Sequence, residues 1–170
     1  VIHKAIVKAN ITIDEIDAVS VANTPGLIGA LLIGLTAAKT LSFALNIPLV
    51  TLNHLHAHIY ACKFEHRSID YPAISLVVSG GHTTLFLTKS ETKHEQIGGT
   101  LDDAAGEAFD KVGKILGLGY PSGPVIDSIS RNGNEKAVTF PRSYLGKGSL
   151  DFSVSGVKTA VLYYCSGQDA

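Results

Sequence analysis

Three histidines fall within five positions of the segment TLNHLHAHIY, residues 51–60, at His54, His56 and His58. Residues four apart on a helix lie about 40° apart around its axis, so His54 and His58 project from one face. His56 points to roughly the opposite side. Two imidazoles on one face can bind a divalent cation, but two ligands alone seldom make a tight site. The spacing therefore raises the question of a metal site whose other ligands lie elsewhere.

A second candidate site lies in LVVSGGHTT, residues 76–84, where Ser79, Gly80 and Gly81 follow an apolar run. Bare backbone amides and a hydroxyl can surround a phosphate group. A tight hairpin turn needs the same glycines and is the simpler interpretation of this stretch taken alone.

Carboxylates recur at helical spacing in the segment GGTLDDAAGEAFDKVGKILGLGYPSGP, residues 98–124. Asp103, Glu107 and Asp110 stand at i, i+4 and i+7 of a helix predicted over residues 103–117. A solvated face, helped by acids in the first turn and by Lys114 one turn on, explains this row without a ligand. A separate apolar stripe predicts a core contact and consists of Ala105, Phe109, Val112 and Leu116.

The predicted helix ends in GLGYPSGP, whose Gly123 and Pro124 open a further helix that reaches residue 131. Asp127 lies one turn into that helix. Amides at a helix start suit a phosphate, and a neighbouring carboxylate suits a ribose or a base. Each of these signals is weak alone, but their order along the chain favours a nucleotide site.

Alternating strands and helices must position these residues. A strand is predicted over residues 17–23, a helix over 29–45 and a short buried strand over 48–52, which leads into the histidine helix. This alternation is typical of a layered α/β protein.

The character of the chain changes around RSIDYP, residues 67–72, and a second lobe is expected to begin near Tyr71. The segment AISLVVSGGHTTLFLT, residues 73–88, predicts two strands joined by a Gly-Gly turn, which is a hairpin. The two helices described above follow. A loop then leads to LDFSVSG, residues 150–156, and a last helix.

Composition supports one ordinary domain, or parts of two, because 45% of the 170 residues are hydrophobic and 17% are charged. The net charge of -1 gives no sign of nucleic-acid binding, so any RNA contact needs a local basic patch or a partner chain. Cys62 and Cys165 match no metal or disulfide spacing, which suits a reducing compartment.

The sequence shows no sign of a membrane span or a signal peptide, and its composition suggests a segment of a longer protein. The apolar run GLIGALLIGLTAAK carries glycines and is judged too short for a membrane span, and no signal peptide is visible. The chain starts at Val1 and contains no methionine, so we expect it to be a segment of a longer protein.

Five stretches together resemble the tRNA N6-adenosine threonylcarbamoyltransferase family, known as TsaD in bacteria and formerly as a glycoprotease family. They are TPGLIGALLIGLTAAKTLSFALNIPLVTLNHLHAH, LVVSGGHTTL, GGTLDDAAGEAFDKVGKILGLGYPSGPVID, FPRSYL and LDFSVSGVKTAV. They run in family order over nearly the whole chain, and DDAAGEAFDK is the most specific of them.

The resemblance implies a two-lobed ATPase fold of the actin, hexokinase and Hsp70 type (ribonuclease H-like), here incomplete at both ends. Residues 1–70 would be the C-terminal part of the first lobe, with the metal-binding helix. Residues 71–170 would be the N-terminal part of the second lobe, with the substrate-binding hairpin and helices. The missing parts include a first hairpin and a C-terminal portion that supplies an Asn for the nucleotide and an Asp as third metal ligand.

The resemblance also assigns roles to individual residues. His54 and His58 match the metal ligands, with iron expected in preference to zinc. The substrate loop and the nucleotide contacts match eight further positions: Val77, Val78, Ser79, Gly80, Gly81, Asp110, Gly123 and Asp127. The sequence names no general base; Asp110 is a candidate by position, with a rival role in binding or in the acidic row of the helix. His56 and Ala57 stand where an acidic residue and a glycine are common, and Val154 stands where phenylalanine is usual.

The implied reaction moves a threonylcarbamoyl group from threonylcarbamoyl-AMP to N6 of the adenosine next to the anticodon of tRNA. The mixed anhydride is already activated, so positioning and charge stabilisation suffice without a covalent nucleophile. The implied partners are tRNA and the accessory subunits of the synthesis complex, with no membrane. The implied location is the cytoplasm, or the mitochondrion in a eukaryote.

Three other interpretations compete. A metalloprotease is disfavoured because a zincin helix carries its Glu directly after the first histidine, where this chain has Leu55. A sugar kinase or chaperone-like ATPase would share the hairpin but has no use for paired histidines. The third is an inactive fragment that retains a partner-binding surface, because the chain lacks the first hairpin and the third metal ligand.

Overall fold

The computed structural model describes residues 1–66, 68–143 and 145–167. Arg67, in the segment where the change of character is expected, and Tyr144, in the FPRSYL motif, lie outside the described residues. The chain forms two compact units, and the first ends at His66. The sequence-based boundary, between residues 70 and 71, lies four residues later. Parallel and antiparallel sheets with helices make the protein mixed α/β.

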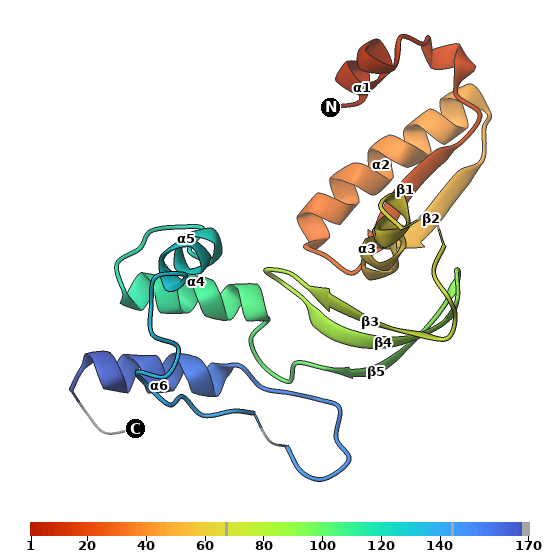
Figure 1. Cartoon of the computed structure of the whole chain (residues 1–170). Coiled ribbons are helices and arrows are strands. Elements are labelled where there is room, and N and C mark those ends of the chain that lie inside the picture. Colours follow the sequence, from red (N-terminus) through yellow and green to blue (C-terminus); the bar gives the residue numbers. More distant parts are fainter. Residues whose placement is uncertain (67, 144, 168–170) are drawn as a thin grey trace. The chain divides into compact units, whose positions relative to one another are not determined.

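The first unit is built around a parallel strand pair. Helix α1 (Ile2–Ala9) and a 3-10 turn (Ile13–Glu15) precede strand β1 (Val19–Thr24), helix α2 (Ile28–Leu45) and strand β2 (Leu49–Asn53). Strand β1 pairs with β2 from Val19 opposite Leu49 onward, and α2 lies along the pair (Figure 1). The predicted order of strand, helix, strand and helix is confirmed, whereas α1 was not predicted.

Helix α2 packs its small residues against the strands. Ala38 is buried, and a Cβ built on Gly34 would lie 3.8 Å from the side chain of Val21. With 18 residues, α2 is long and apolar enough to cross a membrane by length and composition, so the sequence-based judgement that this segment is too short does not hold for the whole helix. The same composition serves a core helix that lies on a sheet, so it is weak evidence for a membrane.

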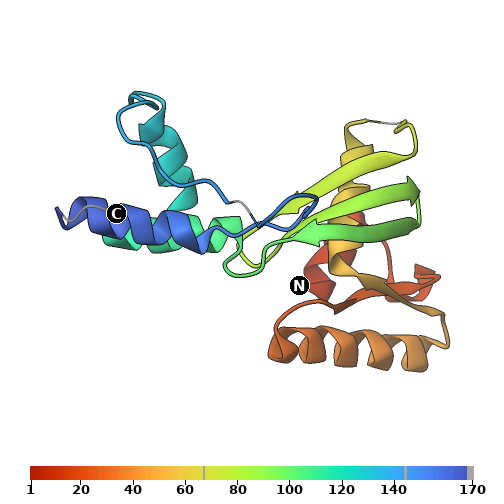
Figure 2. The same ribbon diagram turned by 90° about the horizontal axis from the view of Figure 1, so that it is seen from below.

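The second unit begins with a three-stranded antiparallel sheet, which Figure 2 shows from below. Strand β3 (Ala73–Val78) pairs with β4 (Thr83–Ser90), which pairs with β5 (Lys93–Gly99). The predicted hairpin of β3 and β4 is confirmed. Strand β5 was not predicted, because KHEQIGG is polar and glycine-rich and its strand form depends on pairing with β4.

Three helices complete the second unit: α4 (Ala105–Ile115), α5 (Gly123–Ser130) and α6 (Ser155–Cys165). Helix α4 packs against both α5 and α6, and both views show α4 and α6 side by side (Figures 1 and 2). The apolar stripe of α4 is only partly buried by this helix packing. Phe109 is 48% and Leu116 46% exposed, and an apolar cavity of about 310 Å³ between the three helices is lined by Phe109 and Val154 among others.

Candidate functional site

The histidine pair lies on helix α3 (His54–Ala61), which begins directly after β2. Asn53 caps the helix, since its Oδ1 accepts hydrogen bonds from the amides of Leu55 at 2.8 Å and His56 at 3.3 Å. Leu55 is buried, as is Ile59 one turn further, so the helix turns this face inward. His54 and His58 share another, exposed face, and their position on one face is what the i, i+4 spacing predicts.

The two histidine rings are in direct contact, with their Nε2 atoms within hydrogen-bond distance. The Nε2 atoms of His54 and His58 lie 3.1 Å apart, and the rings meet edge to face with centroids 4.5 Å apart. Both nitrogens can bond one ion at the usual distance of about 2.0–2.1 Å, which corresponds to an angle of about 100° at the ion. This pair therefore fits a divalent metal as two of its ligands. Within the described residues, no group of three or more His, Cys, Asp or Glu side chains is placed to hold an ion.

The hairpin turn between β3 and β4 is closed by its own hydrogen bonds. The amide of Ser79 donates to the carbonyl oxygen of His82 at 2.8 Å, and the amide of His82 donates to the Ser79 hydroxyl at 3.0 Å. Ser79 is thus engaged in shaping the turn. A Cβ built on Gly80 or on Gly81 would meet nothing within 4 Å, so the outer side of the turn is open. Before the turn, Val77 is buried and Val78 is exposed.

The turn rests on the start of α4. The amide of Gly106 donates to the carbonyl oxygen of Ser79 at 3.2 Å, and a Cβ on Gly106 would lie 2.8 Å from the Cα of Gly80. On the neighbouring strand, Thr83 is buried and its hydroxyl accepts a hydrogen bond from the amide of Ala105 at 2.8 Å. Sequence reasoning missed Gly106 and Thr83, although a glycine in the first turn of a helix is a signal of close backbone approach.

A pocket of about 710 Å³ lies between the turn and α4. Its walls come from Gly80 and from α4 and the loop after it, and the remaining lining residues are Glu107, Asp110, Lys111, Lys114, Gly117, Gly119 and Tyr120. This volume is in the range of small-molecule sites in proteins. The structure thus brings together Gly80 and Asp110, two of the residues that the sequence singled out.

Asp110 also holds the next helix in place. Its Oδ1 accepts a hydrogen bond from the amide of Ser122 at 2.8 Å, and Ser122 is fully buried at the start of α5. A Cβ on Gly113 would lie 2.0 Å from the Ser122 side chain, so the two segments are in close contact. Asp110 therefore joins the pocket wall to the beginning of α5.

Gly123 and Asp127 lie on α5 and are not among the residues that line this pocket. Gly123 is the first residue of the helix, as predicted to within one position. Asp127 is exposed, and its Oδ2 accepts a hydrogen bond from Arg131 at 2.8 Å, one turn further along the helix. The structure therefore places Asp127 in a surface ion pair.

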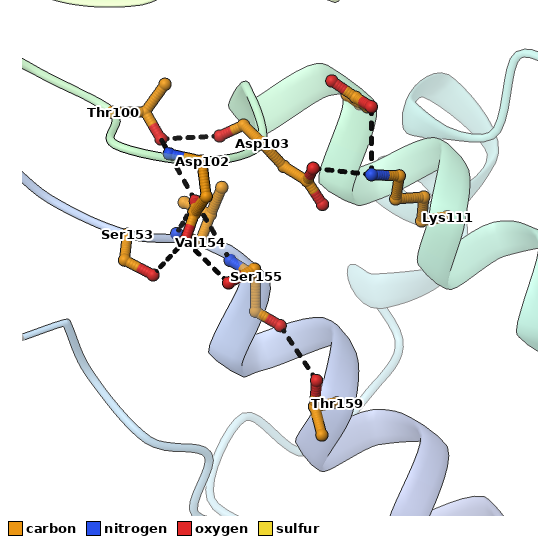
Figure 3. Close-up of polar contacts among 9 residues, drawn as sticks. Thr100, Asp102, Asp103, Lys111, Ser153, Val154, Ser155 and Thr159 are labelled. Atoms are coloured by element: carbon orange, nitrogen blue, oxygen red, sulfur yellow. Dashed lines mark hydrogen bonds and ion pairs between the residues drawn. The ribbon is translucent and has the colours of Figure 1, made fainter.

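Two acids of the predicted row, Asp103 and Glu107, pair with Lys111, where Lys114 was expected. The Nζ of Lys111 lies 2.5 Å from Asp103 and 3.0 Å from Glu107. The hydrogen bond to Asp103, with that to Glu107, raises the pKa of the Lys111 amine. Figure 3 shows Lys111 reaching back to Asp103. Lys111 is one turn closer to both acids than Lys114, which explains the exchange.

Asp102 joins the start of the α4 region to the start of α6 (Figure 3). Its carboxylate accepts hydrogen bonds from the hydroxyls of Ser153 and Ser155 and from the amides of Val154 at 3.0 Å and Ser155 at 3.3 Å. Desolvation raises the pKa of Asp102, but these hydrogen bonds outweigh it and hold the pKa well below its usual range. Sequence reasoning missed this residue, because its partners lie about fifty positions away.

Comparison with known proteins connects these residues to a family. The model of the tRNA N6-adenosine threonylcarbamoyltransferase family (TsaD) matches residues 1–170. The protein of that name from Clostridioides difficile is 51% identical over 168 residues, which cover 99% of this chain and 50% of the relative. The one from Syntrophomonas wolfei is 52% identical over 162 residues, which cover 95% and 48%. The chain spans about half the length of the curated relatives it matches.

A solved structure, YeaZ from Pseudomonas aeruginosa, superposes on 56% of this chain and 45% of its own length. The identity is 14% and the TM-score is 0.41, which is too low to identify a shared fold.

Proposed function

Because the chain belongs to the tRNA N6-adenosine threonylcarbamoyltransferase family, we propose that it forms the central part of an enzyme that modifies tRNA. The donor is threonylcarbamoyl-AMP and the acceptor is N6 of the adenosine next to the anticodon. The observation that carries the proposal is the pocket in which Gly80 of the hairpin turn faces Asp110 of α4. We further propose that the two units belong to two lobes of an actin- and Hsp70-like ATPase fold.

The proposed reaction transfers the threonylcarbamoyl group from a phosphate oxygen of the donor to an amine nitrogen of the acceptor. N6 of the adenosine forms a bond to the carbamoyl carbon, the bond from that carbon to the phosphate oxygen breaks, AMP leaves and N6 loses a proton. Since the donor is a mixed anhydride, the protein must mainly orient the two reactants and stabilise the charge that develops on the leaving phosphate.

In this proposal, different residues of the second unit bind the phosphate and the nucleoside. The amides of Gly80 and Gly81 suit the phosphate, because a Cβ at either glycine would point into open space and the Ser79 side chain is already used to close the turn. Asp110 lines the pocket and is the candidate for binding the ribose or accepting the proton from N6. Contact of the nucleotide with Asp127 requires its ion pair with Arg131 to open, which costs little because exposed pairs of this kind contribute about 0.3–0.5 kcal/mol.

The residues of the first unit supply the proposed metal ligands. His54 and His58 would hold a divalent ion, iron in preference to zinc, together with a carboxylate from outside this chain. When bound, such an ion supplies Lewis-acid polarisation of an oxygen on the activated group. Accessory subunits are proposed to help hold the tRNA, because a net charge of -1 gives this chain little affinity for a polyanion.

The test is a transfer assay with the full-length protein, its accessory subunits, threonylcarbamoyl-AMP and unmodified tRNA. Digestion of the RNA and mass analysis should show threonylcarbamoyladenosine. A complete mixture that yields no modified nucleoside, or that cleaves a glycoprotein instead, would overturn the proposal.

A further inference from the structure

The proposed nucleotide pocket has two ends, set by the length of α4. Gly106, at one end, contacts the Gly80 turn, and the loop that follows the helix closes the other end with Gly117, Gly119 and Tyr120. Gly117 lies eleven positions after Gly106, which corresponds to about 16 Å along the helix axis. A ligand that fills the pocket must therefore be elongated, with one end on the turn and the other on the loop.

The two lysines that line the pocket differ in their partners. Lys111 is bound to both Asp103 and Glu107. Lys114 is exposed and, within the described residues, makes no ion pair or side-chain hydrogen bond. Long side chains on a helix lean toward its N-terminus, so we expect the Lys114 ammonium to reach back along the pocket toward Asp110, which lies between Lys114 and the turn.

A cation in the last turn of a helix also offsets the helix dipole, and this is the simpler role for Lys114. That role does not require the Lys114 side chain to line a pocket whose far end is formed by Gly80. Lys114 lines the same pocket as Gly80 and is not paired with Asp103 or Glu107. Its charge is therefore available to an anion bound at the Gly80 amide.

Tyr120 lies in a loop that backbone geometry and a hydrogen bond hold in place at the end of α4. Gly117 and Gly119 adopt φ angles of +70° and +81°, and the amide of Leu118 donates to the carbonyl oxygen of Gly113 at 2.9 Å, which ends the helix tightly. Ser122, two residues after Tyr120, is fully buried. Tyr120 nevertheless is 86% exposed and lines the pocket, as expected of an aromatic platform for a planar ligand.

We infer that Lys114 binds the phosphate of an adenosine phosphate and that Tyr120 stacks on its base, so that the nucleotide lies along α4 with its phosphate toward Gly80. This inference rests on the proposed function and adds two specificity-determining residues and an orientation to it. The sequence motifs described above assign no role to Tyr120, and to Lys114 only that of a counter-charge to the acidic row.

The experiment compares three probes by calorimetry on the full-length protein: AMP, adenosine and ribose 5-phosphate. Lys114→Met should weaken AMP and ribose 5-phosphate about tenfold or more and leave adenosine within twofold, because only the charged hydrogen bond is lost. Tyr120→Ala should weaken AMP and adenosine about five- to a hundredfold and leave ribose 5-phosphate unchanged, whereas Tyr120→Phe keeps the ring and the affinity. Lys136→Met, an exposed lysine outside the pocket, is the matched control for charge.

The outcomes separate the inference from the function beneath it. If Lys114→Met lowered the affinity for all three probes equally, Lys114 would only stabilise the helix, and its assignment to the phosphate would be overturned. Wild-type protein that binds AMP, with unchanged affinity in both Lys114→Met and Tyr120→Ala, overturns the inference and leaves the proposed function standing. Wild-type protein that binds no adenosine phosphate overturns both.

Discussion

Replacing Gly106 with alanine should separate the hairpin turn from helix α4. The added Cβ would lie 2.8 Å from both the Cα of Gly80 and the carbonyl oxygen of Ser79. Ordinary contacts between such atoms are about 3.5 Å or more, so the turn must move away by about 0.7 Å. The hydrogen bond from the Gly106 amide to Ser79, now 3.2 Å long, would stretch with it.

The magnitude follows from two opposing effects. Crowding of this kind costs about 1–3 kcal/mol, whereas replacing glycine by alanine in a helix contributes about 0.5–1 kcal/mol of stability. Gly106→Ala should therefore lower the free energy of unfolding by about 0.5–2 kcal/mol. Because Gly80 lines the pocket, the affinity for AMP should fall as well.

Gly156 provides a matched control. It is the second residue of α6, as Gly106 is of α4, but a Cβ at Gly156 would meet nothing within 4 Å. Gly156→Ala should raise stability by up to about 1 kcal/mol and leave AMP binding unchanged. Urea unfolding and calorimetry measure both quantities. If the two variants shifted stability in the same direction and by the same amount, the close approach of turn and helix would be refuted.

The other predictions concern the metal, the acid stability and the turn. Metal analysis of the full-length protein should show about one equivalent, lost when His54 and His58 are both changed to alanine and kept in His56→Ala; equal loss in the latter would contradict the ligand assignment. The depressed pKa of Asp102 contributes stability that is complete above its unfolded pKa of about 3.9 and is lost as pH falls toward the folded pKa. Thermal melts should therefore show wild type and Asp102→Asn converging below about pH 4, and a constant gap across that range would sink the argument. Gly80→Val places its side chain in open space, so the protein should fold normally while AMP binding weakens by about 1–3 kcal/mol; unchanged affinity would place the phosphate elsewhere.

Local signals in the sequence determined most of the elements. The helix that carries His54 and His58 begins where Asn53 supplies a cap, and the spacing of four places both rings on one face. The glycines after Ser79 predicted the hairpin, which the structure confirms. Such features depend on a few consecutive residues, because helix periodicity, capping and tight turns are short-range properties of the chain.

Tertiary structure alone decided which of these elements meet. From the sequence we expected Lys114 to support the acidic row, and only the packed structure pairs Lys111 with Asp103. Asp102 gave no local sign of its role, since its hydrogen-bond partners Ser153 and Ser155 are more than fifty positions away. Long-range contacts of this kind depend on how segments distant in the sequence pack together, so spacing and composition along one segment cannot predict them.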